Sequence, residues 1–160
     1  MHICTKVVAC GAASYGVMYV AASMNMVPSI VKRRVKPSQY LAQYKGKQGY
    51  LHGYTLVAKS SLLGLTWSDT FATFDLALPG DQPRLIYYQV LAFNGFAMSD
   101  QEKTTRLFQS IDDQAKKVGP KLEALAFNPA MRSQLEQHGF VLTEEDFDSR
   151  STDLLAKVLA

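Results

Sequence analysis

Residues 7–27 read VVACGAASYGVMYVAASMNMV, and this uncharged stretch dominates what the sequence predicts about the fold. Its 21 residues would extend over about 30 Å as an α-helix, which is the thickness of a bilayer's hydrocarbon core. Pro28 is expected to end the helix, because proline has no N–H for the next turn. The stretch therefore predicts a single N-terminal transmembrane helix within an anchor of residues 1–31.

The predicted span is only weakly apolar, since it contains no Leu, Ile or Phe. A span of this composition is expected to need support from neighbouring helices. Small side chains at three- and four-residue spacing let helix backbones approach closely in lipid. The predicted helix-packing face consists of Ala9, Ala12, Ala13, Gly16 and Ser23.

A basic cluster follows the apolar stretch immediately. The positive-inside rule then places the rest of the chain on the cytosolic, matrix or stromal side of the membrane, and for a mitochondrial protein this is the matrix side. Cations near an anionic surface each contribute about 1 kcal/mol of binding, which predicts a site for the headgroup of a cardiolipin-like anionic lipid. Tyr40 and Tyr44 are predicted to lie in the headgroup layer, although stacking on RNA bases is the alternative. The predicted headgroup residues are Lys32, Arg33, Arg34 and Lys36.

Three other interpretations of the N-terminal stretch compete with a membrane span. It resembles a secretory signal peptide in having small residues at 21–23, and a mitochondrial presequence in having basic but no acidic residues. It is also compatible with an Ala-rich helix buried in the core of a soluble protein.

Composition and charge exclude several classes of protein. The chain has 160 residues, of which 48% are apolar and 11% aromatic, so bulk disorder is excluded. Two cysteines do not make a disulfide scaffold. The net charge of +3 is too small to indicate nucleic-acid binding by itself, although residues 1–68 contain eight Lys/Arg and no Asp or Glu.

The remaining residues are predicted to form a small helical domain at 55–160, joined to the anchor by a basic, Tyr-rich interfacial linker at 32–54. Residues 55–78 have large apolar side chains at helical spacing, which favours an amphipathic helix; a second membrane span is the alternative. Residues 85–98 favour a buried helix, with a hairpin turning at Asn94-Gly95 as the alternative.

The C-terminal third is predicted to contain short helices. Residues 100–118 form an amphipathic pattern that ends at Gly119-Pro120, and Asn128-Pro129 is typical of a helix start. Acidic residues at 144–146 and the apolar positions of 152–159 predict two further helices. The predicted fold class is therefore mainly α, with one transmembrane helix and a helical extramembrane domain.

No catalytic pattern is evident in the sequence. The three histidines are far apart, the cysteines are not in a CxxC, and neither phosphate-binding glycine motif occurs. The sequence therefore predicts no catalytic, cofactor-binding or metal-binding residues and no cofactor. We expect neither a nucleic-acid partner nor a small-molecule substrate.

These features together predict a non-catalytic accessory subunit of an energy-transducing membrane complex. Small single-span proteins without an active site are typical of the mitochondrial respiratory chain or ATP synthase, which predicts the inner membrane as the location and other subunits as partners. A plastid or thylakoid complex is an alternative. So is a soluble enzyme or small-ligand-binding protein with a buried Ala-rich first helix, which a cavity around Trp67, Tyr87 and Tyr88 would support.

Overall fold

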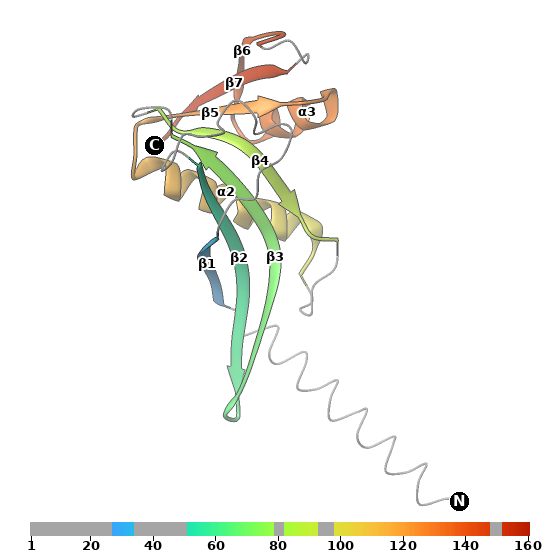
Figure 1. Ribbon diagram of the computed structural model, residues 1–160. Helices are drawn as coiled ribbons and strands as arrows, with labels where there is room; N and C mark the ends of the chain where they lie inside the picture. Colours follow the sequence, from blue (N-terminus) through green and yellow to red (C-terminus); the bar gives the residue numbers. More distant parts are fainter. Residues whose placement is uncertain (1–26, 34–50, 79–81, 93–97, 148–151) are drawn as a thin grey trace, which may run out of the picture.

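The computed structural model describes residues 27–33, 51–78, 82–92, 98–147 and 152–160 (Figure 1). In this part of the chain, one mixed seven-stranded sheet is accompanied by two helices. The elements are β1 (Val27–Arg33), β2 (Leu51–Leu62), β3 (Leu65–Ala77), β4 (Arg84–Val90), α2 (Asp100–Lys116), β5 (Lys121–Ala126), α3 (Pro129–Gln137), β6 (Val141–Glu144) and β7 (Asp153–Val158).

The strand order is β1-β2-β3-β4-β5-β7-β6. Neighbouring strands are antiparallel except for β4 and β5, which are parallel. A parallel pair requires a crossover connection, and α2 lies in that connection behind the sheet (Figure 1). The sheet therefore has two antiparallel halves that meet at the β4–β5 pair.

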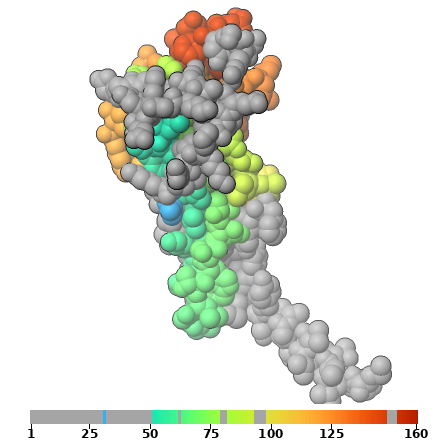
Figure 2. Space-filling view, in the orientation of Figure 1, coloured from blue at the N-terminus to red at the C-terminus, as the bar shows by residue number. Residues whose placement is uncertain are grey.

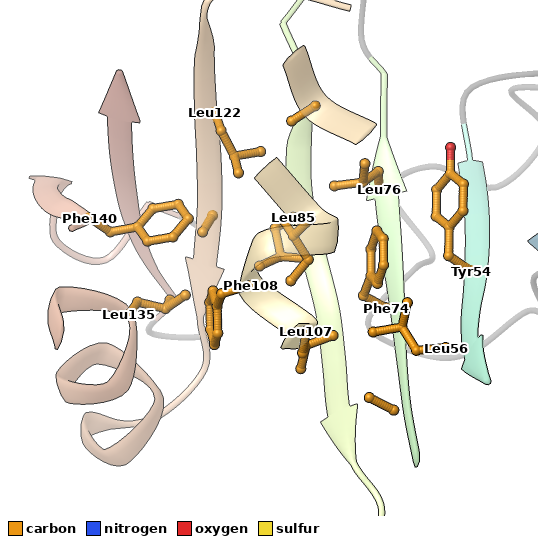
Figure 3. Close-up of a cluster of buried hydrophobic side chains, with 14 of the residues drawn as sticks. Tyr54, Leu56, Phe74, Leu76, Leu85, Leu107, Phe108, Leu122, Leu135 and Phe140 are labelled. Carbon is orange, nitrogen blue, oxygen red and sulfur yellow. The ribbon is translucent and has the colours of Figure 1, made fainter. Parts of the chain in front are cut away.

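The main core lies between one face of the sheet and the two helices. Phe74 and Leu76 of β3 and Leu85 of β4 pack with Leu107 and Phe108 of α2, and all five are almost fully buried (Figure 3). The opposite face of the sheet has a smaller cluster of buried side chains, which comprises Ala77, Ile86, Leu125 and Leu154.

The two helices form where local signals in the sequence predict them. Ser99 caps α2 by accepting a hydrogen bond from the Glu102 N–H, and Asn128 caps α3 through the Met131 N–H. Pro129 occupies the first turn of α3, where its missing N–H costs nothing. The helices predicted at 100–118 and from Asn128-Pro129 are therefore confirmed.

The helix predicted at 55–78 is wrong, because this stretch forms the β2–β3 hairpin. A spacing of four residues, as from Trp67 to Phe71, keeps side chains on one side of a strand as well as of a helix. The next large apolar side chain, Phe74, follows Phe71 at three residues. In a strand, this spacing keeps both side chains on one face only because β3 has a β-bulge opposite Leu56 and Val57. Helical spacing arose here from strand alternation plus one extra residue.

The helices predicted at 85–98 and 152–159 are also wrong. Residues 84–90 form β4, which pairs with β3 and β5. The turn of the alternative hairpin, Asn94-Gly95, lies outside the described residues. Leu154, Leu155 and Ala156 lie in β7 between β5 and β6, and burial on both faces gives the strand a continuous apolar run. The helix predicted from 144–146 is a strand end and turn instead.

The mainly helical fold class is thus contradicted by a mixed sheet. Residues 1–26 of the predicted transmembrane anchor lie outside the described residues. None of the described helices is long and apolar enough to cross a bilayer. Residues 27–33 of the predicted anchor and linker are β1, which pairs with β2. The division of the chain into parts at 1–31, 32–54 and 55–160 stays a prediction.

The β2–β3 hairpin extends well beyond the rest of the sheet (Figures 1 and 2). Its turn uses Leu63 and Gly64 with φ of 51° and 79°, the left-handed region that glycine adopts without strain. β4 pairs with β3 only from Ala72 to Ala77, and β1 pairs with β2 only as far as Lys59. Among the described strands, the outer hairpin from Ser60 to Trp67 is therefore a two-stranded ribbon.

Candidate active site

The parallel strands β4 and β5 separate soon after they begin. Their register contains only Arg84 opposite Glu123 and Leu85 opposite Ala124, after which the strands diverge (Figure 1). The Arg84 guanidinium forms an ion pair with the Glu123 carboxylate at 2.8 Å, with both side chains mostly buried. This pair joins the strands at the point from which they diverge, and we call this V-shaped divergence of β4 and β5 the split.

The backbone of β4 presents hydrogen-bonding groups to the split. The Leu91 N–H donates to the Phe71 carbonyl at 2.9 Å, so Leu91 faces β3. Backbone groups of successive residues point to opposite sides of a strand, so those of Tyr88 and Val90 point away from β3. Since the β4–β5 register ends at Leu85, neither residue has a partner in β5.

A β-bulge lies in β4 at the closed end of the split. Leu76 is opposite Leu85, but Asp75 is opposite Tyr87, so Ile86 is the extra residue. Beyond the bulge, Tyr88 pairs with Phe74 and packs against the main core, which places its side chain on the helix side. Tyr87 consequently lies on the opposite face of the sheet.

Tyr88 connects β4 with α3. Its hydroxyl donates to Gln134 Oε1 at 2.7 Å, and its ring makes an edge contact with Phe108, with ring centroids 5.3 Å apart. Since β5 leads directly into α3, this hydrogen bond links the two arms of the split. Burial raises the pKa of Tyr88 to about 12, so the phenol keeps its proton at physiological pH.

Folding stability is expected to fall above about pH 10 because of Tyr88. Below that pH the phenol is neutral in both states; between about 10 and 12 only the unfolded chain releases the proton, which favours unfolding. The full shift corresponds to about 2.7 kcal/mol, and partial solvent access reduces our expectation to about 1–2 kcal/mol. Urea unfolding at about pH 9 and about pH 11.5 should show this loss in the wild type and not in Tyr88→Phe. Equal losses in both proteins would contradict the expectation.

The opening turn of α2 lies next to the end of β4. Lys103 is 2% exposed, and its Nζ donates to the Leu91 carbonyl at 2.8 Å, which ties the helix to the residue after β4. The Arg106 guanidinium pairs with the Glu102 carboxylate at 2.9 Å, and the Asp100 carboxylate is exposed. A shallow hollow of about 550 Å³ runs along this part of α2, lined by Ser99, Gln101, Glu102, Thr105, Arg106 and Gln109.

His138 belongs to the packing behind this site rather than to its surface. Its ring stacks on Phe108 with centroids 3.8 Å apart. Burial, with a smaller contribution from the nearby Lys157 cation, lowers the pKa of His138, so the imidazole is neutral at physiological pH. Its role is to fill the space between the two helices.

Most of the sequence-predicted site residues lie outside the described part of the chain. This holds for the helix-packing face (Ala9, Ala12, Ala13, Gly16 and Ser23), for Arg34 and Lys36, and for Tyr40 and Tyr44. Lys32 and Arg33 lie in β1 opposite Tyr54 and Gly53. The structure brings none of the described members of these sets to the split.

The aromatic residues suggested for a ligand cavity are separated. Tyr87 and Tyr88 lie on opposite faces of β4, and Trp67 lies on the outer hairpin, where it packs against the main core. Sequence reasoning missed Asp75, Gln134 and the open edge of β4, because each depends on strand pairing. The only local signal was the charged Asp75 within an apolar run.

Solved structures provide the comparison with known proteins, since no family model and no curated protein matches the chain. The ribosomal-protein-S18-alanine N-acetyltransferase from Escherichia coli has a TM-score of 0.53 at 13% identity, covering 84% of this chain and 95% of that one. A putative N-acetyltransferase from Lactobacillus plantarum has a TM-score of 0.53 at 11% identity, with 84% and 99% covered. The spermidine N-acetyltransferase from Vibrio cholerae has a TM-score of 0.51 at 9% identity, with 85% and 95% covered.

The chain therefore has the GNAT N-acetyltransferase fold. At these identities the likeness concerns the fold alone. It nevertheless contradicts the predicted non-catalytic accessory subunit of a respiratory-chain or ATP-synthase complex, because these three neighbours are all named as N-acetyltransferases. The findings agree better with the alternative of an enzyme or small-ligand-binding protein.

The predicted partners and location are corrected for the same reason. The spermidine N-acetyltransferase of this fold is named for a small-molecule substrate, which contradicts the expectation of none. The anionic-lipid site was inferred from the basic cluster beside the predicted anchor, and the complex subunits and the single-pass placement in the inner membrane from the accessory-subunit interpretation. That interpretation does not fit a GNAT fold whose described helices include no membrane span.

Proposed function

We propose that this protein is an N-acetyltransferase that moves an acetyl group from acetyl-coenzyme A to an amine. The observation that carries the proposal is the split, where parallel strands β4 and β5 separate after two residue pairs. The backbone groups of Tyr88 and Val90 face this opening without a partner in β5. The GNAT fold of the chain supports the same activity.

The pantetheine arm of acetyl-coenzyme A fits the open edge of β4. This arm is extended and contains two amides, so it can add to an unpaired strand edge as another strand does. Strand addition supplies affinity through main-chain hydrogen bonds and needs no particular side chains. We therefore assign the donor's amides to the Tyr88 and Val90 backbone.

Transfer replaces a carbon–sulfur bond by a carbon–nitrogen bond. The amine nitrogen attacks the thioester carbonyl carbon, and the sulfur leaves with the electron pair of the broken bond. The proton that the nitrogen loses is matched by the one that the sulfur gains. Tyr88 lies at the split with its hydroxyl protonated, so we assign it as proton donor to the departing sulfur, which in this role replaces Gln134 Oε1 as the acceptor of the hydroxyl hydrogen.

The diphosphate of coenzyme A does not fit the described opening turn of α2. A helix N-terminus attracts anions, but Asp100 and Glu102 place two carboxylates there. Within residues 98–116, Lys103 is committed to the Leu91 carbonyl and Arg106 to the Glu102 carboxylate. We therefore derive no contribution of α2 to diphosphate binding.

Acetyl-pantetheine, which lacks the nucleotide, is expected to be nearly as good a donor as acetyl-coenzyme A. A favourable anion site at α2 would make the full donor much better, whereas an acidic first turn should keep the kcat/KM ratio within about tenfold. Initial rates with both donors at one amine concentration measure this ratio. A preference of about a thousandfold for acetyl-coenzyme A would contradict the assignment at α2 while leaving the proposed activity in place.

Amine-dependent release of thiol from acetyl-coenzyme A tests the proposed activity. The full chain should release thiol when spermidine or a peptide with a free N-terminal alanine is present, and acetylated amine should appear in equal amount by mass spectrometry. Tyr88→Phe should lower kcat by about 10²–10⁴-fold because the proton donor is lost. Absence of both amine-dependent release and acetyl-coenzyme A binding would overturn the proposal.

A further inference from the structure

Lys103 is the charged member of the buried face of α2. The other buried residues of this helix are Leu107, Phe108, Ile111 and Ala115. The Lys103 side chain is 2% exposed, whereas the Asp100 carboxylate, 3.7 Å from its Nζ, is 83% exposed. Solvent screens an exposed carboxylate, so Asp100 compensates the buried ammonium only weakly. An apolar side chain at this position would be buried without the cost of desolvating a charge.

The Lys103 ammonium has its close partner in the backbone beyond the end of β4. Its Nζ donates to the Leu91 carbonyl at 2.8 Å, where the start of α2 lies beside the end of β4 (Figure 1). The Leu91 N–H donates to the Phe71 carbonyl of β3 at 2.9 Å. Both backbone groups of Leu91 are thus held, one by α2 and one by β3. A hydrogen bond from a charged donor is stronger than a neutral one, so Lys103 anchors this residue firmly.

Leu91 lies where the edge of β4 needs support. The ladder between β3 and β4 ends at the pair of Ala72 and Val90, and the pairing of β4 with β5 ends at Leu85. A strand end with a partner on one side opens easily, because few hydrogen bonds have to break. Peptide units are planar, so fixing the Leu91 N–H also fixes the Val90 carbonyl, which points the opposite way, into the split.

We propose that Lys103 is a positioning residue for the acetyl donor: it anchors Leu91, so that the Val90 backbone faces the split in one orientation. This inference rests on the proposed function. Lys103 touches neither the donor nor the reacting atoms, and acts on them through the backbone of β4. Its effect is therefore on the affinity for the pantetheine arm.

Lys103→Met tests the positioning role, because it removes the ammonium and keeps an unbranched side chain of similar length in the packing. We expect KM and Kd for acetyl-coenzyme A to rise about five- to thirtyfold. The kcat should stay within about threefold of wild type, because Tyr88 and its proton are unchanged. Unchanged KM and Kd in Lys103→Met would overturn the proposal.

Two further variants control this experiment. Lys103→Arg keeps a charged donor at the same position and should recover part of the lost affinity. Lys116→Met removes the same charge from an exposed position in the last turn of α2, and should leave KM and Kd unchanged. A rise in Lys116→Met as large as that in Lys103→Met would mean that the charge of the helix, and not the anchor at Leu91, determines donor affinity.

Acetyl-pantetheine distinguishes an effect through the backbone from a direct contact with the nucleotide. Both donors contain the same pantetheine arm, so Lys103→Met should raise KM for both by the same factor. If only the KM for acetyl-coenzyme A rose, Lys103 would bind the nucleotide part directly, and the positioning role would be wrong.

Amide hydrogen exchange tests the anchor without a donor, which separates it from the proposed function. In Lys103→Met the Leu91 N–H should exchange at least about tenfold faster than in the wild type, while the Gln89 N–H, inside the β3–β4 ladder, changes less than about threefold. Equal exchange at Leu91 in both proteins would contradict the anchor. If the wild type binds no acetyl-coenzyme A, the proposed function fails, and the exchange rates alone show whether Lys103 holds β4.

Should Lys103→Met not fold, Lys103→Gln decides. Its shorter side chain keeps a neutral donor, and we expect the Kd for acetyl-coenzyme A to rise about three- to tenfold. A Kd equal to that of the wild type would then refute the positioning role.

Discussion

Replacing Phe74 with alanine is expected to lower the free energy of unfolding by about 3–5 kcal/mol. Phe74 is fully buried at the centre of the main core, where its ring stacks on Tyr54 with centroids 4.8 Å apart (Figure 3). The substitution removes apolar contacts and leaves a cavity between the sheet and α2, which packed neighbours fill only in part. A loss of this size is a large share of the stability of a single domain.

Urea unfolding followed by circular dichroism measures the effect of Phe74→Ala. Leu63→Ala is the control, because Leu63 is 85% exposed at the hairpin turn and its truncation should change stability by less than about 0.5 kcal/mol. A loss below about 1 kcal/mol in Phe74→Ala would show that this face of β3 is not the core of the protein.

Replacing Val90 with proline should impair donor use far more than folding. The Val90 N–H points into the split, so proline removes the donor assigned to a pantetheine amide carbonyl without breaking the β3–β4 ladder. An amide left unpaired costs about 1–3 kcal/mol, or roughly 5- to 150-fold in kcat/KM for acetyl-coenzyme A. Initial-rate kinetics, together with a thermal melt of the same samples, check both parts of this expectation.

Gln89→Pro is the matched control for Val90→Pro. Its N–H faces β3, opposite Thr73, so proline there removes a ladder hydrogen bond and should cost about 1–3 kcal/mol of stability. Val90→Pro could instead prove the less stable of the two variants and retain full donor use. The Val90 N–H would then face β3 and the Gln89 N–H would face the split, the reverse of the arrangement described.

Local signals in the sequence were sufficient for α2 and α3. The Asn128-Pro129 start, the Gly119-Pro120 stop and the amphipathic pattern of 100–118 act within one or two turns, so they operate without the rest of the chain. The turn signals at 79–83 likewise fall between β3 and β4. These elements are determined by interactions between residues close in sequence.

The strands could not be predicted in the same way. Leu154 and Leu155 are buried on opposite faces of β7, and a strand covered on both faces has no alternation to detect. In β3, a bulge converted strand alternation into the three- and four-residue spacing of a helix. An apolar stretch at 7–27 that dominated the prediction then led to a membrane interpretation that the sheet does not support.

The sequence by itself determined the two helices, the charge asymmetry and the apolar residues available for a core. Only the tertiary structure decided that β4 and β5 are parallel neighbours that separate after Leu85, and that Asp75 and Tyr87 share a row beside Tyr88 and the split. The physical reason is that helix signals depend on neighbours within four residues, whereas strand register depends on partners up to dozens of residues away. Glu123, which pairs with Arg84 at the closed end of the split, is 39 residues from it in the chain.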